Sequence, residues 1–330
     1  MPFLNSLYIQ IKEIENSEDC SKEKKKWNQE CESAIAQISQ ILIDRDGFKQ
    51  IRFCVPKSFL DIDSQFERNC QRYDMTLTFA QLLMKQSENI QNLKLRNFTL
   101  SDQLELIKNV VHSKQLKELA FTLPGATISS EVIDKTKAKL QRGYPAYSEE
   151  ESTFEGRTFE TMFLKHLDLV RSLKQLEKVK VENTKCSRSK WDFYALCIPA
   201  LQALKEIDVS SSDKKGDSRD NASYKGWTDA RKLLKAISES NSIQKLYCNI
   251  VIPTIEITNF LKAKSYPIYF EDRGKKYGFH EFMELHKATS HMHYLNVKIL
   301  GMEGPTIGDK KKTVPENVMV QALLAVKQGM

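Results

Sequence analysis

Histidines come nearest to a metal-binding pattern in this chain. Four of the six lie within fourteen residues, at His280, His286, His291 and His293. His291 and His293 are two residues apart at the start of a predicted strand, so their side chains would share one face. A zinc site closes with a third or fourth donor at a defined spacing. Glu281 and Glu284 are available nearby, but no metal-site spacing emerges. We therefore expect ordinary surface histidines and no bound metal.

Closely spaced carboxylates are the next candidates, because a general acid and a general base often come as a pair of such groups. Asp61 lies two residues from Asp63, and three glutamates run from Glu149 to Glu151. Both sets lie in polar stretches, where they would face solvent. The sequence lacks the glycine-rich phosphate-binding motifs, the GxSxG nucleophile turn and the HExxH zinc motif. We expect no enzymatic activity, no cofactor and no small-molecule substrate.

The segment RGKKYGF combines cations with aromatic rings in a way that suits RNA, since cations meet phosphates and rings stack on bases. The contacts would come from Arg273, Lys275, Lys276 and Tyr277. The segment stands alone, however, because the net charge of +7 arises from 50 basic and 43 acidic residues spread along the whole chain. Association with RNA is therefore the alternative function, and binding to nucleic acid is not the leading expectation.

A repeated hydrophobic signature, apolar-x-x-apolar-x-apolar, predicts the elements that would position these residues. Clear copies start at Phe48, Ile90, Leu116, Leu176, Leu204, Ile243 and Met292, and weaker ones start at Gln141 (QRGYPA) and Ala263 (AKSYPI). From Ile90 onward the intervals average about 29 residues, which is typical of a solenoid. Two long intervals contain polar, turn-rich stretches at 148–156 and 210–226. We expect these to be surface loops inserted into the array.

Between the signatures the hydrophobic period changes from two to about three and a half, which indicates a strand followed by a helix in each repeat. The predicted helices cover Ser101–His112, Glu160–Leu173, Ser189–Leu204, Trp227–Ser238 and Phe279–Ala288. Between Phe48 and Ile90, a further helix is predicted at Ser58–Cys70 or at Phe79–Gln86. Each helix has one apolar stripe, so it needs a neighbouring repeat to cover it.

The signature and its strand-plus-helix period resemble the leucine-rich-repeat superfamily, in a degenerate form of the ribonuclease-inhibitor-like class. The resemblance covers about residues 48–297. In that family an asparagine after the strand hydrogen-bonds the backbone of the turn; the equivalent positions here are Phe98, Pro124, Thr184, Ser212, Val251 and Leu300. The resemblance implies an α/β solenoid with a curved parallel sheet on the concave side and helices on the convex side.

Three regions follow along the chain. Residues 1–47 are predicted to form an N-terminal helical cap, because apolar residues recur at helical spacing from Ser21 to Ile43. Residues 48–300 form the leucine-rich-repeat-like solenoid, with about eight to nine irregular repeats. Residues 301–330 form a linker and a helix from Pro315 onward, which either caps the solenoid or binds a partner.

Composition indicates a soluble intracellular protein. The hydrophobic fraction is 41%, and no stretch reaches the ~18 to 20 apolar residues that span a bilayer. Seven cysteines, an odd number without a CxxC pair, favour reduced thiols over a disulfide framework. The N-terminal segment has neither a secretory apolar run nor the pattern of a transit peptide. We expect a cytoplasmic or cytoskeletal location and no association with membranes.

Function is predicted from the alternate strand positions, which would point to the concave face. The partner-binding residues expected there are Arg52, Lys94, Arg96, Lys180, Glu182, Asp208, Tyr247, Asn249, Tyr269, Asn296 and Lys298. A polar surface with tyrosine and arginine suits a protein partner, because these residues often dominate interface energetics. We expect a non-enzymatic scaffold or adaptor that holds protein partners within a multi-subunit complex.

The resemblance implies several kinds of assembly for such a scaffold. Members of the superfamily serve as subunits of cytoskeletal and ciliary complexes, as substrate receptors of ubiquitin ligases and as pathogen effectors. Residues 1–47 lack the Leu-Pro start of an F-box-like helix pair. We therefore favour a structural subunit of a larger assembly over a ligase receptor or an effector.

Overall fold

A computed structural model of the 330-residue chain provides the fold. It describes residues 5–10, 47–55, 66–123, 128–148, 158–183, 188–208, 222–248, 254–263, 269–277 and 295–299, together with residues 33, 37, 280, 283, 284 and 287. The chain divides into two compact units, Met1–Tyr247 and Cys248–Met330. Each unit is described by itself.

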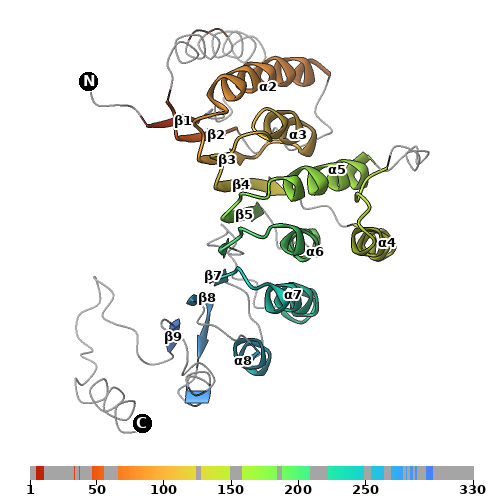
Figure 1. Ribbon diagram of the computed structural model, residues 1–330, viewed down its shortest axis with the longest axis vertical. Helices are drawn as coiled ribbons and strands as arrows, with labels where there is room; N and C mark the ends of the chain where they lie inside the picture. Colours follow the sequence, from red (N-terminus) through yellow and green to blue (C-terminus); the bar gives the residue numbers. More distant parts are fainter. Residues whose placement is uncertain are drawn as a thin grey trace, which may run out of the picture. The chain divides into compact units, whose positions relative to one another are not determined.

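An open parallel sheet forms one side of the first unit (Figure 1). Its strands are β1 (Ser6–Gln10), β2 (Gln50–Cys54), β3 (Asn92–Arg96), β4 (Glu118–Leu123), β5 (Lys178–Asn183), β6 (Glu206–Asp208) and β7 (Lys245–Cys248). Every strand pairs in parallel with the next one in the chain, so the spatial order equals the sequence order. This topology is that of a stack of strand-helix repeats.

Helices cover the other side of this sheet (Figure 1). They are α2 (Phe66–Gln86), α3 (Leu100–Lys108), α4 (Ser130–Gln141), α5 (Thr158–Ser172), α6 (Arg188–Cys197) with the 3₁₀ helix η3 (Ile198–Ala200), and α7 (Ala222–Glu239). Side chains of Thr99 and Ser129 cap α3 and α4 by accepting hydrogen bonds from Asp102 N and Val132 N. The structure thus shows an α/β fold of solenoid-like arrangement.

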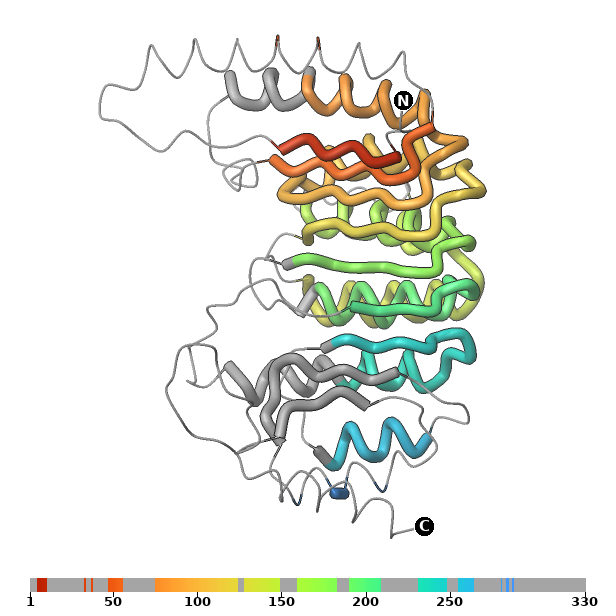
Figure 2. The backbone as a smooth tube through the Cα atoms, turned by 90° about the vertical axis from the view of Figure 1, so that its left-hand side faces the viewer, coloured from red at the N-terminus to blue at the C-terminus, as the bar shows by residue number. Residues whose placement is uncertain are grey.

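The strands of the first unit lie side by side in chain order (Figure 2). From β2 onward, each one starts with the same pair of backbone hydrogen bonds. The carbonyl of Asn5 accepts from two successive amides, Lys49 N and Gln50 N, at 2.9 and 3.0 Å. The same pair of bonds recurs at each of the next strands, with the carbonyls of Lys49, Gln91, Lys117, Glu177 and Lys205 as acceptors. Each repeat therefore satisfies the polar backbone of its neighbour at the same point.

The core lies between sheet and helices and consists of the signature residues. Phe53 of β2 stacks on Phe79 of α2 with ring centroids 4.2 Å apart, and Phe121 of β4 meets Phe193 of α6 edge-on at 5.3 Å. The apolar signature positions of the clear copies from Phe48 to Leu204 are buried wherever the structure describes their side chains. Burial of these rings and branched side chains supplies most of the free energy that holds neighbouring repeats together.

Two differences from the sequence expectations concern strands of the first unit. No strand is predicted before Phe48, yet β1 pairs with β2 along its whole length. Conversely, the weak signature at Gln141 is not a strand, because Gln141 ends α4 and a turn follows. Gly143 in this turn has a φ of +83°, a conformation that glycine adopts without strain, and Pro145 lacks a donor for a sheet. The interval between β4 and β5 therefore contains two helices, α4 and α5, of which α4 was not predicted.

The second unit contains α8 (Thr254–Lys262), β8 (Tyr269–Tyr277) and β9 (Leu295–Ile299). The helix α8 is not among the predicted ones. Strands β8 and β9 are parallel, with an irregularity in register between Asp272 and Lys276. The weak signature at Ala263 predicts a strand too early, since Ala263 follows α8 directly and β8 begins at Tyr269. Within the part of the chain that the structure describes, no helix is long and apolar enough to cross a membrane.

Several predicted elements lie outside the described residues. The N-terminal helix at Ser21–Ile43 is described only at Ser33 and Gln37, which are helical and share a side-chain hydrogen bond of 3.3 Å. The region 301–330 is not described at all. Both terminal caps, and the choice between a capping and a partner-binding C-terminal helix, remain predictions. Between Phe48 and Ile90, the helix predicted at Phe79–Gln86 forms the C-terminal part of α2, which begins earlier, at Phe66.

Candidate functional site

The candidate site is the open face of the first unit, which we define as the side of β1–β7 opposite the helices. The register aligns its residues in rows across the sheet. One row consists of Tyr8, Arg52, Lys94, Ala120, Lys180, Asp208 and Tyr247. The row beside it consists of Ser6, Gln50, Asn92, Glu118, Lys178, Glu206 and Lys245. Polar side chains from sequence-distant strands are therefore neighbours.

A basic cluster, consisting of Arg52, Lys94 and Arg96, occupies the open face at β2 and β3. Arg52 lies opposite Lys94 in the register of the two strands, and Arg96 lies opposite Cys54. The open-face positions of β1, β2 and β3 carry no carboxylate. Paired positions on neighbouring strands are about 4.8 Å apart, so these cations repel one another unless an anion lies close.

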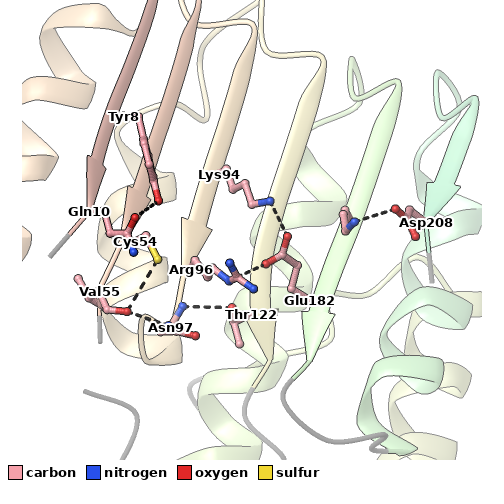
Figure 3. Close-up of polar contacts among 11 residues, drawn as sticks. Tyr8, Gln10, Cys54, Val55, Lys94, Arg96, Asn97, Thr122, Glu182 and Asp208 are labelled. Atoms are coloured by element: carbon pink, nitrogen blue, oxygen red, sulfur yellow. Dashed lines mark hydrogen bonds and ion pairs between the residues drawn. The ribbon is translucent and has the colours of Figure 1, made fainter. Parts of the chain in front are cut away.

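Glu182 supplies the one carboxylate that reaches this cluster within the described residues. Its Oε1 lies 2.6 Å from Lys94 Nζ, and its Oε2 lies 3.2 Å from Arg96 Nε (Figure 3). Glu182 belongs to β5, two strands away, and the short side chain of Ala120 on the intervening strand leaves room for Lys94 to reach it. The Glu182 residue is only 6% exposed. The ion pair is therefore partly shielded from water, which strengthens it.

Arg52 has no such partner in the described part of the chain. Its guanidinium makes no hydrogen bond or ion pair there, and its buried Nε lacks an acceptor. The guanidinium carbon lies 4.6 Å from the centre of the Tyr8 ring, which is a cation–π contact. The aromatic ring stabilises the charge from one side but accepts none of its hydrogen bonds.

The open face of β5–β7 is balanced in charge, in contrast to β2 and β3. Lys180 Nζ lies 2.8 Å from Asp208 Oδ2, and Lys178 forms an ion pair with Glu206. Lys245 approaches the same Glu206 at 3.8 Å. Burial, the largest single influence, opposes the charged form of Lys178, but the hydrogen bond to Glu206 and the attraction of nearby negative groups together outweigh it, so the pKa of Lys178 is raised.

Cys54 is the nucleophilic group nearest to the basic cluster, but its surroundings keep it protonated. Burial raises the pKa of the Cys54 thiol, although Arg96 and Arg52 oppose that rise. Cys54 is 8% exposed, and its Sγ lies 4.0 Å from the carbonyl oxygen of Val55. Since the thiolate is the reactive form, this cysteine is poorly placed for covalent chemistry.

Two buried side chains fix the strands that carry the charges. Asn97 follows β3 with a φ of +65°, donates from Nδ2 to the Val55 carbonyl at 2.7 Å, and its amide donates to Thr122 Oγ1 at 3.1 Å. The hydroxyl of Tyr194 on α6 accepts from Val181 N at 2.7 Å and donates to the Asp208 carbonyl at 2.9 Å. These bonds hold β2–β4 and β5–β6 at fixed offsets.

Sequence reasoning missed Asn97 and Tyr8. The repeat spacing predicts the family-type asparagine at Phe98, one residue after Asn97. Tyr8 was missed with β1, although LNSLYI from Leu4 onward has the same apolar spacing as the other signatures. The sequence contained the signal in both cases. The motif is degenerate enough to allow an additional copy near the N-terminus and an asparagine shifted by one residue.

Six of the predicted partner-binding residues lie together on the open face: Arg52, Lys94, Arg96, Lys180, Glu182 and Asp208. Tyr247 lies beside Asp208 in register and is half-buried. Tyr269 begins β8 in the second unit, and Asn296 and Lys298 belong to β9. Asn249 lies outside the described residues.

The residues considered for metal, acid–base and RNA chemistry are only partly described. Of the four clustered histidines the structure describes His280, which is exposed and helical. The carboxylates at Asp61, Asp63 and 149–151 lie outside the described residues. The four candidate RNA contacts, Arg273, Lys275, Lys276 and Tyr277, belong to strand β8. Among the described residues, no group of three or more metal-ligating side chains could hold an ion.

The comparisons with known proteins add no family to this picture. No protein-family model matches the chain, and no curated protein matches it at a significant level. The function must therefore be argued from the geometry of the open face alone.

Proposed function

We propose that this chain is a non-enzymatic protein-interaction scaffold that holds partner proteins along the open face of its parallel sheet. The observation that carries the proposal is the open face itself. It presents two rows of mainly polar and aromatic side chains, aligned across seven strands. Packed phenylalanines on the opposite side of the sheet support these strands. A wide surface built on rigid strands suits a protein better than a small ligand, which prefers a concave apolar pocket.

Preorganisation supports the same proposal. The ion pairs Lys94–Glu182 and Lys180–Asp208 hold long side chains in one arrangement before a partner arrives. Side chains that are already ordered lose less conformational entropy on binding, so more of the contact energy contributes to affinity. The half-exposed ring of Tyr8 adds an aromatic anchor at the edge of the array.

We propose further that the fold is a degenerate leucine-rich-repeat solenoid. The bond from Asn97 to the Val55 carbonyl supports this, because the family's asparagine also follows a strand and bonds the backbone of the turn, and Val55 directly follows β2. The repeated pair of backbone bonds at each strand start supports it as well. Such a scaffold would act as a structural subunit of a larger assembly.

A pair of matched variants tests the scaffold function. Tyr8→Ala with Lys245→Ala removes two exposed side chains from opposite ends of the open face. Tyr144→Ala with Lys135→Ala removes the same residue types from the α4 region, where both are also exposed. Tagged full-length proteins would be expressed in the native source, and their stoichiometric partners quantified by mass spectrometry.

The open-face variant should lose a partner that the wild type and the α4 variant retain, while all three melt at similar temperatures. Binding of that partner should then be reproduced with purified components. An identical set of partners for both variants would contradict the proposal, because a scaffold that uses this face cannot lose two of its exposed side chains without effect.

A further inference from the structure

Charge is distributed unevenly over the open face, and we infer that its basic cluster, Arg52, Lys94 and Arg96, is the docking site for an aspartate- and glutamate-rich segment of a partner protein. This inference rests on the scaffold function proposed above and names the chemistry of its ligand. Within the described residues, three cations of the cluster face one carboxylate, whereas every lysine on β5–β7 contacts a carboxylate: Lys180 pairs with Asp208, and Lys178 and Lys245 share Glu206.

Arg52 is the strongest reason to expect an anion. Its guanidinium has five donors, yet it forms no hydrogen bond or ion pair within the described residues, and its Nε is already removed from water. A buried donor without an acceptor is unfavourable, so a carboxylate that reaches the guanidinium gains more than it would from a solvated arginine. The Tyr8 ring covers one face of the guanidinium and leaves the edge, where the donors lie, for a ligand.

The ligand is inferred to be a carboxylate because the cluster already binds one. Glu182 contacts both Lys94 and Arg96, so the spacing of these cations fits a carboxylate bridged between two strands. Arg52 stands beside Lys94 in the same row. A partner segment with two or more acidic residues could engage Arg52 first and then compete with Glu182 for the other two cations.

A nucleic acid fits this surface less well than an acidic peptide. A phosphate backbone needs a basic track over many ångströms, but the cluster is only two strands wide. Carboxylates lie beyond it on the same face, with Glu118 on β4 and Glu206 and Asp208 on β6. Because these carboxylates interrupt and neutralise the cations on β5–β7, a polyanion that extended along the sheet would meet no continuous basic track.

Glu182 acts in this scheme as an internal ligand that competes with the partner. Its removal has a clear consequence, because a Glu182→Gln substitution frees Lys94 and Arg96 without removing a cation. Both cations are partly exposed, with side-chain accessibilities of 29% and 35%, so water can solvate them in the variant. A merely structural role of the ion pairs would not make the protein bind an external anion more tightly.

Fluorescence anisotropy at low salt with the full-length protein tests the inference. The probe is a fluorescein-labelled peptide of six glutamates, and a labelled six-nucleotide oligouridylate serves as the polyanion comparison. The decisive variant is Arg52→Glu. Its matched control is Arg142→Glu, which makes the same charge change at an exposed residue after α4. Thermal melting establishes that each variant folds.

The expected result is a dissociation constant for the hexaglutamate peptide that rises by about tenfold or more in Arg52→Glu, because a like charge replaces an attractive one. It should change little in Arg142→Glu and should fall by about threefold to fivefold in Glu182→Gln. Equal binding by the two charge-reversal variants would overturn the inference. So would a lack of any gain in Glu182→Gln, or tighter Arg52-dependent binding of the oligouridylate.

Failure of this inference can be told apart from failure of the scaffold function. If Arg52→Glu retains every native partner while Tyr8→Ala with Lys245→Ala loses one, the acidic ligand is wrong and the scaffold stands. If neither variant loses a partner, both proposals are overturned.

Discussion

The side-chain amide of Asn97 donates a hydrogen bond of 2.7 Å to the backbone carbonyl of Val55, which joins the ends of β3 and β2. The two residues are 42 positions apart in the chain, yet they are neighbours in consecutive repeats. Asn97 has a φ of +65°, which asparagine tolerates better than most residues because its short amide bonds locally. One residue thus serves both the turn after the strand and the contact between repeats.

Substitution of Asn97 should lower the free energy of unfolding by two separable amounts. Asn97→Gly keeps the left-handed backbone but loses the bond to the Val55 carbonyl, and we expect a loss of about 1–3 kcal/mol. Asn97→Ala adds the strain of a positive φ, about 1–2 kcal/mol more. Chemical unfolding followed by circular dichroism measures both values. Equal stability of the alanine and glycine variants would show that the backbone conformation is not strained.

Tyr194→Phe should destabilise the protein although it removes a single oxygen atom. The hydroxyl is buried and bonds both Val181 N and the Asp208 carbonyl, so its loss leaves a donor and an acceptor unsatisfied in the core. We expect a loss of about 2–4 kcal/mol in the free energy of unfolding. Tyr147→Phe serves as a control, because its ring is only partly buried and contacts Lys165 through its face. A change of equal size in both variants would contradict the proposed role of the Tyr194 hydroxyl.

His166 should make stability depend on pH. The imidazole is fully buried between Phe121 and Phe193, with ring centroids 4.6 and 5.7 Å away, and neither ring nitrogen has a hydrogen-bond partner. Burial lowers the pKa of His166 to about 3, whereas an unfolded histidine has a pKa of about 6.5. Below about pH 6.5 the unfolded chain binds a proton that the folded protein does not bind. The free energy of unfolding therefore decreases as the pH is lowered from about 6.5 to about 3.

A His166→Leu variant isolates this effect. Between pH 8 and pH 5 the wild type should lose about 2 kcal/mol more than the variant, because one and a half pH units separate pH 5 from the unfolded pKa. Unfolding by denaturant at several pH values measures the difference. The variant should also be at least as stable as the wild type at pH 8, since it removes two unsatisfied buried nitrogens. Parallel curves of stability against pH for the two proteins would contradict the buried neutral imidazole.

The buried thiols of Cys54 and Cys197 should react slowly and in a fixed order. Burial raises the pKa of both Cys54 and Cys197, and they are 8% and 1% exposed. Because the thiolate is the reactive form, iodoacetamide at pH 8 should label Cys54 slowly and Cys197 more slowly still. Arg52→Gln should slow the labelling of Cys54, because Arg52 opposes the rise of that pKa. Peptide mass spectrometry over time measures both rates, and labelling in denaturant provides the reference in which the order should disappear.

Most of the first unit could be predicted from the sequence, because burial imposes its period on the chain. A strand begins two residues after the start of each of the signatures at Phe48, Ile90, Leu116, Leu176 and Leu204, and its apolar residues face the helices. The exceptions have local causes. QRGYPA fits the apolar spacing only at Tyr144 and Ala146, because its first position is the polar Gln141. Gly143 and Pro145 form a turn there instead of a strand. The helix α4 has few apolar residues and little buried surface, so its period was too weak to detect.

What the sequence by itself determined is which residues face inward and which face the open side, since alternation along a strand depends only on local spacing and on the hydrophobic effect. Which charges meet was decided by the tertiary structure. Lys180 and Asp208 are 28 residues apart, and Lys94 reaches Glu182 over Ala120 only because the register of three strands aligns them. Such pairing depends on the offsets between strands, and those offsets arise from contacts between repeats that no local pattern records.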